Sequence, residues 1–209
     1  MIRQLEGLGG RLLMAVEPLP DELEPRDLQR LHANERAMAD GFASASRRHQ
    51  SLAGRLLLRN LLSVWYGSDQ LDWVHCERIE GAPWLVGGDG PLPSVSLSHC
   101  RGYVAAAIGE SAMDVGVDVE CRVSSDIDAV AERFDWPIDR DPDRFQTAWT
   151  VWEAAVKARV DQPHDLVRAF FDRGSVGNYS VWNWPVAPMA QVSVVARLSD
   201  DQVARSSVA

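Results

Sequence analysis

The sequence predicts an α+β fold of two similar lobes, each a small sheet packed with helices. The predicted elements run in the order strand, helices, strands, helices, strands, and this order divides into two halves near residue 112. With 209 residues, the chain has room for one large or two small domains and a sizeable buried core. We therefore expect an N-terminal lobe over residues 1–112 and a C-terminal lobe over residues 113–209, although no sequence repeat marks them.

The first half combines a strand, helices and a later group of strands. Residues 11–16 (RLLMAV) predict a strand that ends at the turn of Pro18 and Pro20. Residues 46–65 keep a 3.6-residue apolar spacing behind Ser46 as a candidate cap, which predicts a long helix. The other expected elements are a helix over residues 27–40, strands over 71–77, 95–98 and 103–108, and a Gly- and Pro-rich loop over 81–94.

The second half opens on the most regular strand pattern of the chain. Residues 114–120 (DVGVDVE) carry valine at every second position, with acidic residues or glycine between, which predicts a half-buried strand by its period of two. The elements expected after it are helices over residues 125–134 and 144–160 and strands over 179–184 and 191–198.

Composition excludes several classes of protein. The net charge of -9 and pI near 5.0 argue against a general nucleic-acid binder, which needs a basic face. The N-terminus lacks the continuous apolar stretch of a signal peptide, and no apolar run reaches the roughly 18 residues that suggest a membrane span. We therefore expect a soluble, cytoplasmic protein.

Two residue types are used unusually. The three cysteines, Cys76, Cys100 and Cys121, are odd in number and irregularly spaced, which fits neither a disulfide framework nor a zinc site, so we expect buried reduced thiols. Lys157 is the one lysine among 21 basic residues. Because a compact ammonium and a planar guanidinium are not interchangeable, a single retained lysine is a candidate functional residue, although chance retention explains it equally well.

Three acidic residues form a candidate metal site. Asp118 and Glu120 are two apart on the predicted strand and share a face, and Glu153 and Lys157 are four apart on the predicted helix and share another. If this helix packs beside the strand, the three carboxylates meet and raise one another's pKa unless a cation lies among them. Hard oxygen ligands in small number suit Mg²⁺. Spacing alone leaves another interpretation open, a solvent-facing strand and an exposed Glu–Lys helix pair.

Beyond spacing, the order of the motifs resembles that of a known family. Residues 116–120 (GVDVE) and 149–158 (WTVWEAAVKA) resemble the paired signatures GxDxE and W-x-x-K-E-A-x-x-K-A of the 4′-phosphopantetheinyl transferases. Residues 96–100 (SLSHC) look like the S-x-S-H-S strand end of that family, 81–83 (GAP) its G-K/R-P, and 51–59 (SLAGRLLLR) part of its long N-terminal helix. The resemblance spans about residues 10–160 and implies the Sfp-type class, a monomeric pseudo-dimer of two α+β lobes.

The resemblance implies a reaction and its catalytic residues. Such enzymes transfer the phosphopantetheine arm of coenzyme A to a serine of an acyl or peptidyl carrier protein and release 3′,5′-ADP. Asp118, Glu120 and Glu153 would hold Mg²⁺ on the pyrophosphate, and Glu153 would also take the serine proton, directly or through a water. Lys157 would neutralise charge on the phosphate or leaving group.

The resemblance also implies how the nucleotide is held. Ser98 and His99 would contact its phosphates, and Arg48 is a candidate for the 3′-phosphate. Trp152 and Ala82 stand where the family carries basic residues, so we expect weaker coenzyme A binding or compensation by other cations. The candidates for that compensation are Arg47, Arg48, Arg55 and Arg101.

Two further functions stay open at this point. The missing cations at positions 82 and 152 favour a carrier-protein-binding or regulatory protein that has lost efficient catalysis. A Mg²⁺-dependent hydrolase of another nucleotide is a third hypothesis, without a motif for a water-activating base. The acidic residue that the family often carries after a Phe-rich turn has only Asp135 or Asp139 as substitutes.

Overall fold

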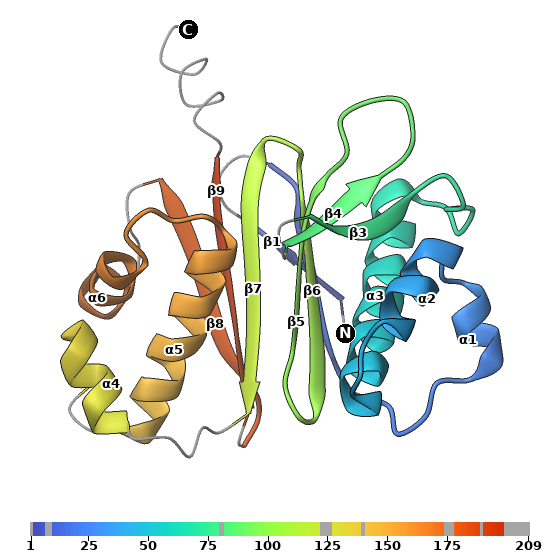
Figure 1. Cartoon of the computed structure of the whole chain (residues 1–209). Coiled ribbons are helices and arrows are strands. Elements are labelled where there is room, and N and C mark those ends of the chain that lie inside the picture. The colour runs from blue at the N-terminus through green and yellow to red at the C-terminus, as the bar shows by residue number, and fades with distance from the viewer. Residues whose placement is uncertain are drawn as a thin grey trace, which may run out of the picture.

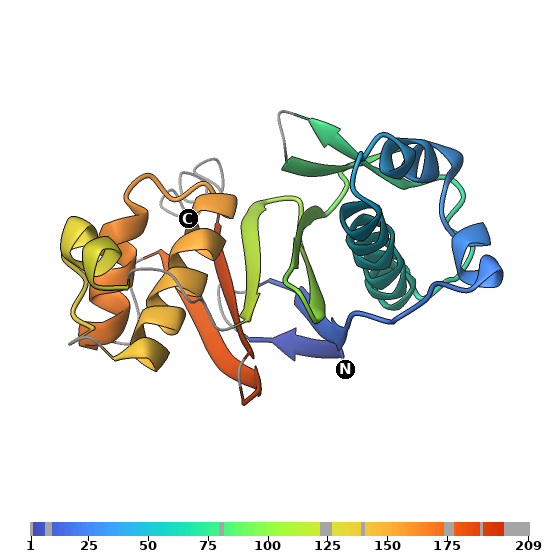
Figure 2. The same cartoon turned by 60° about the horizontal axis from the view of Figure 1, so that its bottom comes forward.

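The computed structural model describes residues 2–6, 10–79, 82–121, 127–138, 141–173, 178–188 and 190–198. The chain is an α+β protein, as the sequence predicts, and over these residues it has six helices and three small antiparallel sheets. Two sheets pack face to face in the middle, and a long helix covers the outer face of each (Figures 1 and 2).

The first sheet and its helix come from the first half of the chain. The sheet has the order β1-β2-β6-β5, with β1 at Ile2–Leu5, β2 at Leu12–Pro18, β5 at Ser94–His99 and β6 at Tyr103–Gly109. Helix α3 (Ala45–Tyr66) packs on it. The Ser44 hydroxyl accepts a hydrogen bond from Arg47 N at the helix start, and Gly67 ends the helix in the left-handed conformation at φ 67°.

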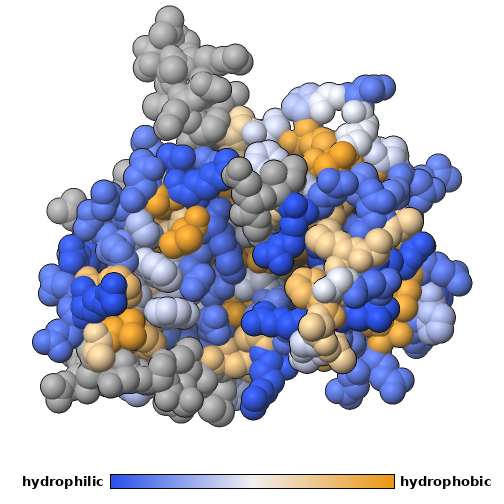
Figure 3. Space-filling view, in the orientation of Figure 1, coloured by the Kyte–Doolittle hydropathy of each residue, from blue (hydrophilic) through white to orange (hydrophobic). Residues whose placement is uncertain are grey.

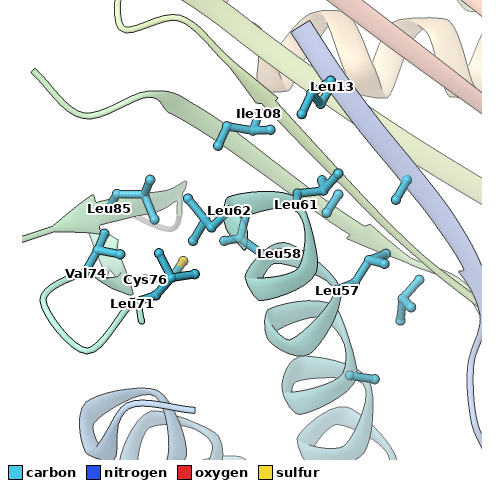
Figure 4. Close-up of a cluster of buried hydrophobic side chains, with 14 residues drawn as sticks. Leu13, Leu57, Leu58, Leu61, Leu62, Leu71, Val74, Cys76, Leu85 and Ile108 are labelled. Carbon is cyan, nitrogen blue, oxygen red and sulfur yellow. The ribbon is translucent and has the colours of Figure 1, made fainter. Parts of the chain in front are cut away.

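Strand β2 is buried on both faces, which explains its continuous apolar sequence. Leu13 faces α3, where it joins the leucines of the helix in the cluster of Figure 4. Leu12 and Met14 face the second sheet instead. Alternation along the strand therefore divides one apolar run between two separate cores.

The second sheet comes from the second half. It has the order β7-β9-β8, with β7 at Met113–Cys121, β8 at Tyr179–Ala187 and β9 at Ala190–Leu198. Helix α5 (Pro142–Lys157) packs on it, and α4 (Ile127–Phe134) and α6 (Pro163–Arg173) pack on α5. Asp141 caps α5 by accepting hydrogen bonds from Asp143 N and Arg144 N, and Pro142 takes the first helical position, where its missing N–H costs nothing.

The two larger sheets share a strand order. In each, one strand precedes a long helix and an antiparallel hairpin comes later in the chain, with β3 and β4 intervening in the first half, and the last strand of the hairpin lies between the other two, in the orders β2-β6-β5 and β7-β9-β8. The strand β1 is an addition at the edge of the first sheet. Strands β5 and β7 run beside each other at the junction, where the Ser96 hydroxyl accepts a hydrogen bond from Val117 N at 3.0 Å.

Several expected elements differ in the structure. The single helix expected over residues 27–40 is two, α1 (Pro25–Gln29) and α2 (Ala33–Asp40), because the His32 side chain caps the start of α2. Helix α3 is capped by Ser44, not Ser46. The expected loop over residues 81–94 contains strand β4 (Ala82–Val86), which pairs with β3 (His75–Ile79). Neither β1 nor α6 was predicted, because one is short and the other follows a proline in a polar segment.

The expectation that all three cysteines are reduced is wrong. Cys100, after the end of β5, forms a disulfide with Cys121, the last residue of β7. Cys76 is buried and free, as predicted. Irregular spacing in the sequence concealed the pair, because β5 and β7 become neighbours only after folding.

Surface polarity agrees with the composition. Hydrophilic side chains dominate the face seen in Figure 3, with smaller apolar groups among them. Within the described residues, no helix is both long enough and apolar enough to cross a bilayer.

Candidate functional site

A large cavity opens at the junction of the two halves. Its volume is about 1240 Å³, and side chains from α3, β4, β5, β7 and α5 line it. This volume exceeds the roughly 300–1,000 Å³ of common small-molecule pockets, so it suits an extended ligand.

The structure brings the predicted carboxylates to this cavity. Asp118 and Glu120 reach it from β7, and Glu153 and Lys157 reach it from α5. Gly116 makes this approach possible, because a Cβ atom at that position would collide with the backbone oxygen of Ala154 and lie 2.7 Å from Ala158 N. Helix α5 thus lies directly on the backbone of β7 at Gly116, two residues before Asp118.

A buried polar network fixes α5 on the second sheet. Gln146 Nε2 donates to the backbone oxygen of Glu120 at 2.8 Å. Ser193 Oγ of β9 donates to Thr150 Oγ1 at 2.8 Å, and Asn183 Nδ2 of β8 donates to Ser193 Oγ at 2.7 Å. Because these groups lie in or beside the core, each bond satisfies a polar atom that would otherwise be unpaired.

Lys157 and Ser98 meet at the carboxylate of Asp118. Lys157 Nζ lies 2.7 Å from Asp118 Oδ1 and also donates to Ser98 Oγ at 3.1 Å and to the Val117 carbonyl at 3.2 Å. Ser98 Oγ in turn donates to Asp118 Oδ1 at 2.8 Å. The Asp118 side chain is 3% exposed, and within the described part of the chain its Oδ2 atom is buried without a hydrogen-bond partner.

The pKa values of both glutamates are raised. That of Glu120 is raised to about 7, chiefly by burial and then by the charges of Asp118 and Glu153, and Lys157 and a hydrogen bond from Trp149 partly offset these effects. Burial and the charge of Asp118 also raise the pKa of Glu153. Both shifts are those expected of carboxylates that share a partly dry site with too little positive charge.

His99 lies on the other side of the same cavity. Its Nε2 atom is 3.4 Å from Arg47 Nη1, and burial together with the Arg47 charge lowers the imidazole pKa. A neutral ring next to an arginine can accept a hydrogen bond from it or donate to an anionic ligand, depending on the tautomer. Ser98 and His99, which the resemblance implies as contacts of the nucleotide phosphates, both line the cavity.

The basic residues of the cavity differ from the expected set. Arg48 is exposed, pairs with Asp40 at 2.5 Å, and is not among the described residues that line the cavity. Arg47 lines it instead, on a helix face that it shares with Ser51 and Arg55 at the spacing i, i+4, i+8. That spacing was visible in the sequence and separates Arg47 from Arg48. The arginines in the lining are Arg47, Arg55, Arg78 and Arg159.

The positions that depart from the family pattern have separate environments. Trp152 stacks with Phe134 and His164, at centroid distances of 5.7 and 5.8 Å, in an aromatic cluster between α4, α5 and α6. Ala82 lines the cavity. The exposed Asp135 pairs with Arg168 at 3.4 Å, away from the cavity lining. Gly81 and Asp139 lie outside the described residues.

The donor set suits a hard divalent cation, but its arrangement is not a closed ligand cage. Asp118, Glu120 and Glu153 supply carboxylate oxygens of the kind that Mg²⁺ prefers, and the unpartnered Asp118 Oδ2 is such a donor. In the described ranges, however, no three His, Cys, Asp or Glu side chains are grouped closely enough to bind one ion together. The positive charge at Asp118 is instead the ammonium of Lys157.

Comparisons with known proteins add no assignment. No protein-family model matches the chain, and no curated protein shows significant similarity to it.

Proposed function

We propose that the protein is a Mg²⁺-dependent 4′-phosphopantetheinyl transferase, which modifies a serine of an acyl or peptidyl carrier protein with the arm of coenzyme A. One observation carries the proposal. Four short segments that resemble the motifs of this family, separated by up to about 75 residues, all contribute side chains to one cavity. They are represented there by Ala82 and Pro83, Ser98 and His99, Asp118 and Glu120, and Glu153 and Lys157.

The distribution of charge in the cavity supports a phosphorylated ligand. Three of the four lining arginines come from α3 and β3 and the fourth, Arg159, follows α5, whereas the carboxylates come from β7 and α5. A ligand with several phosphates would meet cationic side chains at one end and a metal-binding group at the other. The cavity volume of about 1240 Å³ is large enough for a nucleotide joined to a long arm.

The proposed reaction is a displacement at phosphorus. The serine oxygen of the carrier protein forms a bond to the β-phosphorus of coenzyme A, and the bond from that phosphorus to the bridging oxygen breaks. The electron pair leaves with 3′,5′-ADP, and the serine proton passes to Glu153. Burial and the charge of Asp118 raise the pKa of Glu153, which increases its affinity for that proton.

The remaining residues would hold and neutralise the pyrophosphate. Asp118, Glu120 and Glu153 would bind Mg²⁺ once their side chains turn toward one another, since in the ligand-free structure these described carboxylates are not grouped closely enough to share an ion. The ion would supply Lewis acidity and neutralise charge on the phosphate oxygens. Lys157 would contact the phosphate or leaving oxygen, and His99 with Arg47 would contact the nucleotide end. Phosphoryl transfer depends mainly on such positioning and charge stabilisation.

The repeated strand order supports the finer architecture of the proposal. We propose that the two halves, each with the order first, third, second, are the lobes of a pseudo-dimer. In that arrangement a ligand cavity at the junction takes one wall from each lobe.

Incubation of apo carrier proteins with coenzyme A and Mg²⁺, followed by mass spectrometry, tests the proposal. We expect the mass of the carrier to increase by that of the phosphopantetheine arm. Asp118→Asn should reduce the rate about 100-fold or more, because it removes a charged group from the reacting centre. The matched control is Asp135→Asn, which changes an exposed aspartate outside the cavity lining and should retain the full rate.

The pairing of Lys157 with Asp118 favours a second candidate, a carrier-binding or regulatory protein with little catalysis. Calorimetry separates the two. Carrier-protein binding without coenzyme A binding, together with no mass gain on several carriers, would reject the transferase and favour this alternative.

A further inference from the structure

We infer that Lys157 occupies the cation position at Asp118 in the ligand-free protein, and that it must leave Asp118 for a ligand phosphate when a divalent metal binds. This inference deepens the proposed function and rests on it. It makes Lys157 an exchangeable counter-ion, which couples the binding of the metal to the binding of a pyrophosphate.

The hydrogen bonds of Lys157 show that its ammonium is fully engaged. A lysine has three N–H donors, and Lys157 directs them to Asp118 Oδ1, Ser98 Oγ and the Val117 carbonyl, at 2.7, 3.1 and 3.2 Å. All three acceptors belong to β5 and β7, across from α5. Nothing is left on the ammonium to bind a phosphate unless one of these bonds breaks.

The surroundings of Asp118 explain why a cation is needed there. The carboxylate is buried, and a buried ionised carboxylate without a positive partner is strongly unfavourable. Its other oxygen, Oδ2, has no hydrogen-bond partner among the described residues. Asp118 therefore presents Oδ1 to Lys157, and Oδ2 is the oxygen that would bind a metal ion.

The ammonium and a divalent ion compete for this carboxylate. A metal bound to Asp118 would lie within a few ångström of Lys157 Nζ, and the two positive charges would repel each other in a partly dry site. The Lys157 side chain is 30% exposed and lies on a flexible four-carbon stem, so its head can turn toward the cavity. A pyrophosphate bound in the cavity would then accept hydrogen bonds from the Lys157 ammonium.

Coupling of the two ligands follows. The metal binds weakly when Lys157 has no other anion to contact, and more tightly when a pyrophosphate accepts the ammonium. By reciprocity, the pyrophosphate gains the same factor from the metal, and such factors are typically about 5–150-fold.

The single lysine provides a direct test on the unmodified protein. Labelling with lysine that carries ¹⁵N at Nζ gives one side-chain ammonium signal, which can only be Lys157. We expect Mg²⁺ and inorganic pyrophosphate added together to shift this signal strongly, and Mg²⁺ alone to shift it much less at the same concentration. A signal that stays in place while calorimetry shows both ligands bound, or calorimetry that shows no binding, would overturn the inference.

Two variants test the competition by calorimetry with Mn²⁺ as the probe. Lys157→Met should bind Mn²⁺ alone about tenfold more tightly than the wild type, and pyrophosphate should no longer increase that affinity. Arg26→Gln removes the same charge from an exposed position of α1 outside the cavity lining, so it should keep the wild-type enhancement. Equal enhancement in Lys157→Met and wild type would contradict the exchange.

These outcomes are independent of the transfer assay. A shifted ammonium signal in a protein that modifies no carrier would reject the proposed function and keep the exchange. Efficient transfer with an unmoved ammonium would reject the exchange alone. If Lys157→Met does not fold, the signal from the wild-type protein still decides.

Discussion

At the scale of single residues, Glu120 links the electrostatics of the cavity to pH. Its pKa is raised from an ordinary value of 4.5 to about 7, chiefly by burial and then by the Asp118 charge. Between these two values the folded protein holds a proton at Glu120 that the unfolded chain releases. The contribution of Glu120 to the free energy of unfolding is therefore lowest above pH 7, where its side chain is ionised.

The prediction concerns the difference in unfolding free energy between the wild type and Glu120→Gln. As the pH rises from about 4.5 to about 7, the wild type should lose unfolding free energy relative to Glu120→Gln, because only the wild type must ionise a buried carboxylate. Above that range the difference should stay level. Urea unfolding at a series of pH values measures it. A difference that stays constant across the range would show that Glu120 titrates normally.

The positions of the cavity residues were predictable from the sequence only in part. Spacing along one strand and one helix indicated that Asp118, Glu120 and Glu153 could meet if the helix packs beside the strand, and all three line one cavity together with Lys157. Their shared role as metal ligands stays a prediction. Spacing did not predict that Lys157 pairs with Asp118, because the choice between a lysine and a metal ion depends on distances that spacing does not contain. Arg47, not Arg48, shares a helix face with Ser51 and Arg55, and it is Arg47 that lines the cavity.

At the scale of elements, the contact between α5 and β7 depends on Gly116. We predict that Gly116→Ala lowers the free energy of unfolding by about 1–3 kcal/mol, because the added methyl group meets the backbone of Ala154 and Ala158 and not a movable side chain. It should also lower metal binding, since α5 carries Glu153 and Lys157. Thermal and urea unfolding provide the measurement.

Gly54→Ala is the matched control. A Cβ atom at Gly54 in the middle of α3 would meet nothing within 4 Å, so the same substitution should stabilise the helix by roughly 0.5–1 kcal/mol. If both variants lose stability alike, steric contact at Gly116 is not the reason for the glycine.

Elements with a clear period were the predictable ones. Helix α3 and strand β7 follow from apolar spacing alone, and the structure confirms both. The break between α1 and α2 was missed because it depends on the side chain of His32, an uncommon cap. Strand β4 was missed because Gly and Pro on either side of it suggested a loop.

At the scale of the whole molecule, the Cys100–Cys121 disulfide joins the ends of β5 and β7, and so links the two sheets beside the cavity. Its neighbours in the chain are His99 and Glu120, one from each side of the junction. The bond closes a loop with a sequence separation of 21 residues. This link was beyond sequence reasoning, since it depends on how the two halves pack.

We predict that reduction of this disulfide lowers the free energy of unfolding by about 3 kcal/mol, the loop-closure value for a ring of this size. Urea unfolding with and without a dithiol reductant measures the change. The Cys100→Ser/Cys121→Ser double variant should not respond to the reductant, and Cys76 should be the only thiol that reacts in the unreduced, unfolded chain. A reductant effect of equal size in the double variant would contradict the assignment.

The polar network beneath α5 selects one register of this helix on the second sheet. Apolar packing by itself tolerates a helix that slides by one turn, about 5.4 Å, because similar residues then fill similar spaces. The bonds of Gln146 to β7 and of Thr150 to β9 tolerate no such shift, since each buried polar atom left unpaired costs about 1–3 kcal/mol. The network thus destabilises the shifted registers, and this fixes the position of Glu153 and Lys157 along β7.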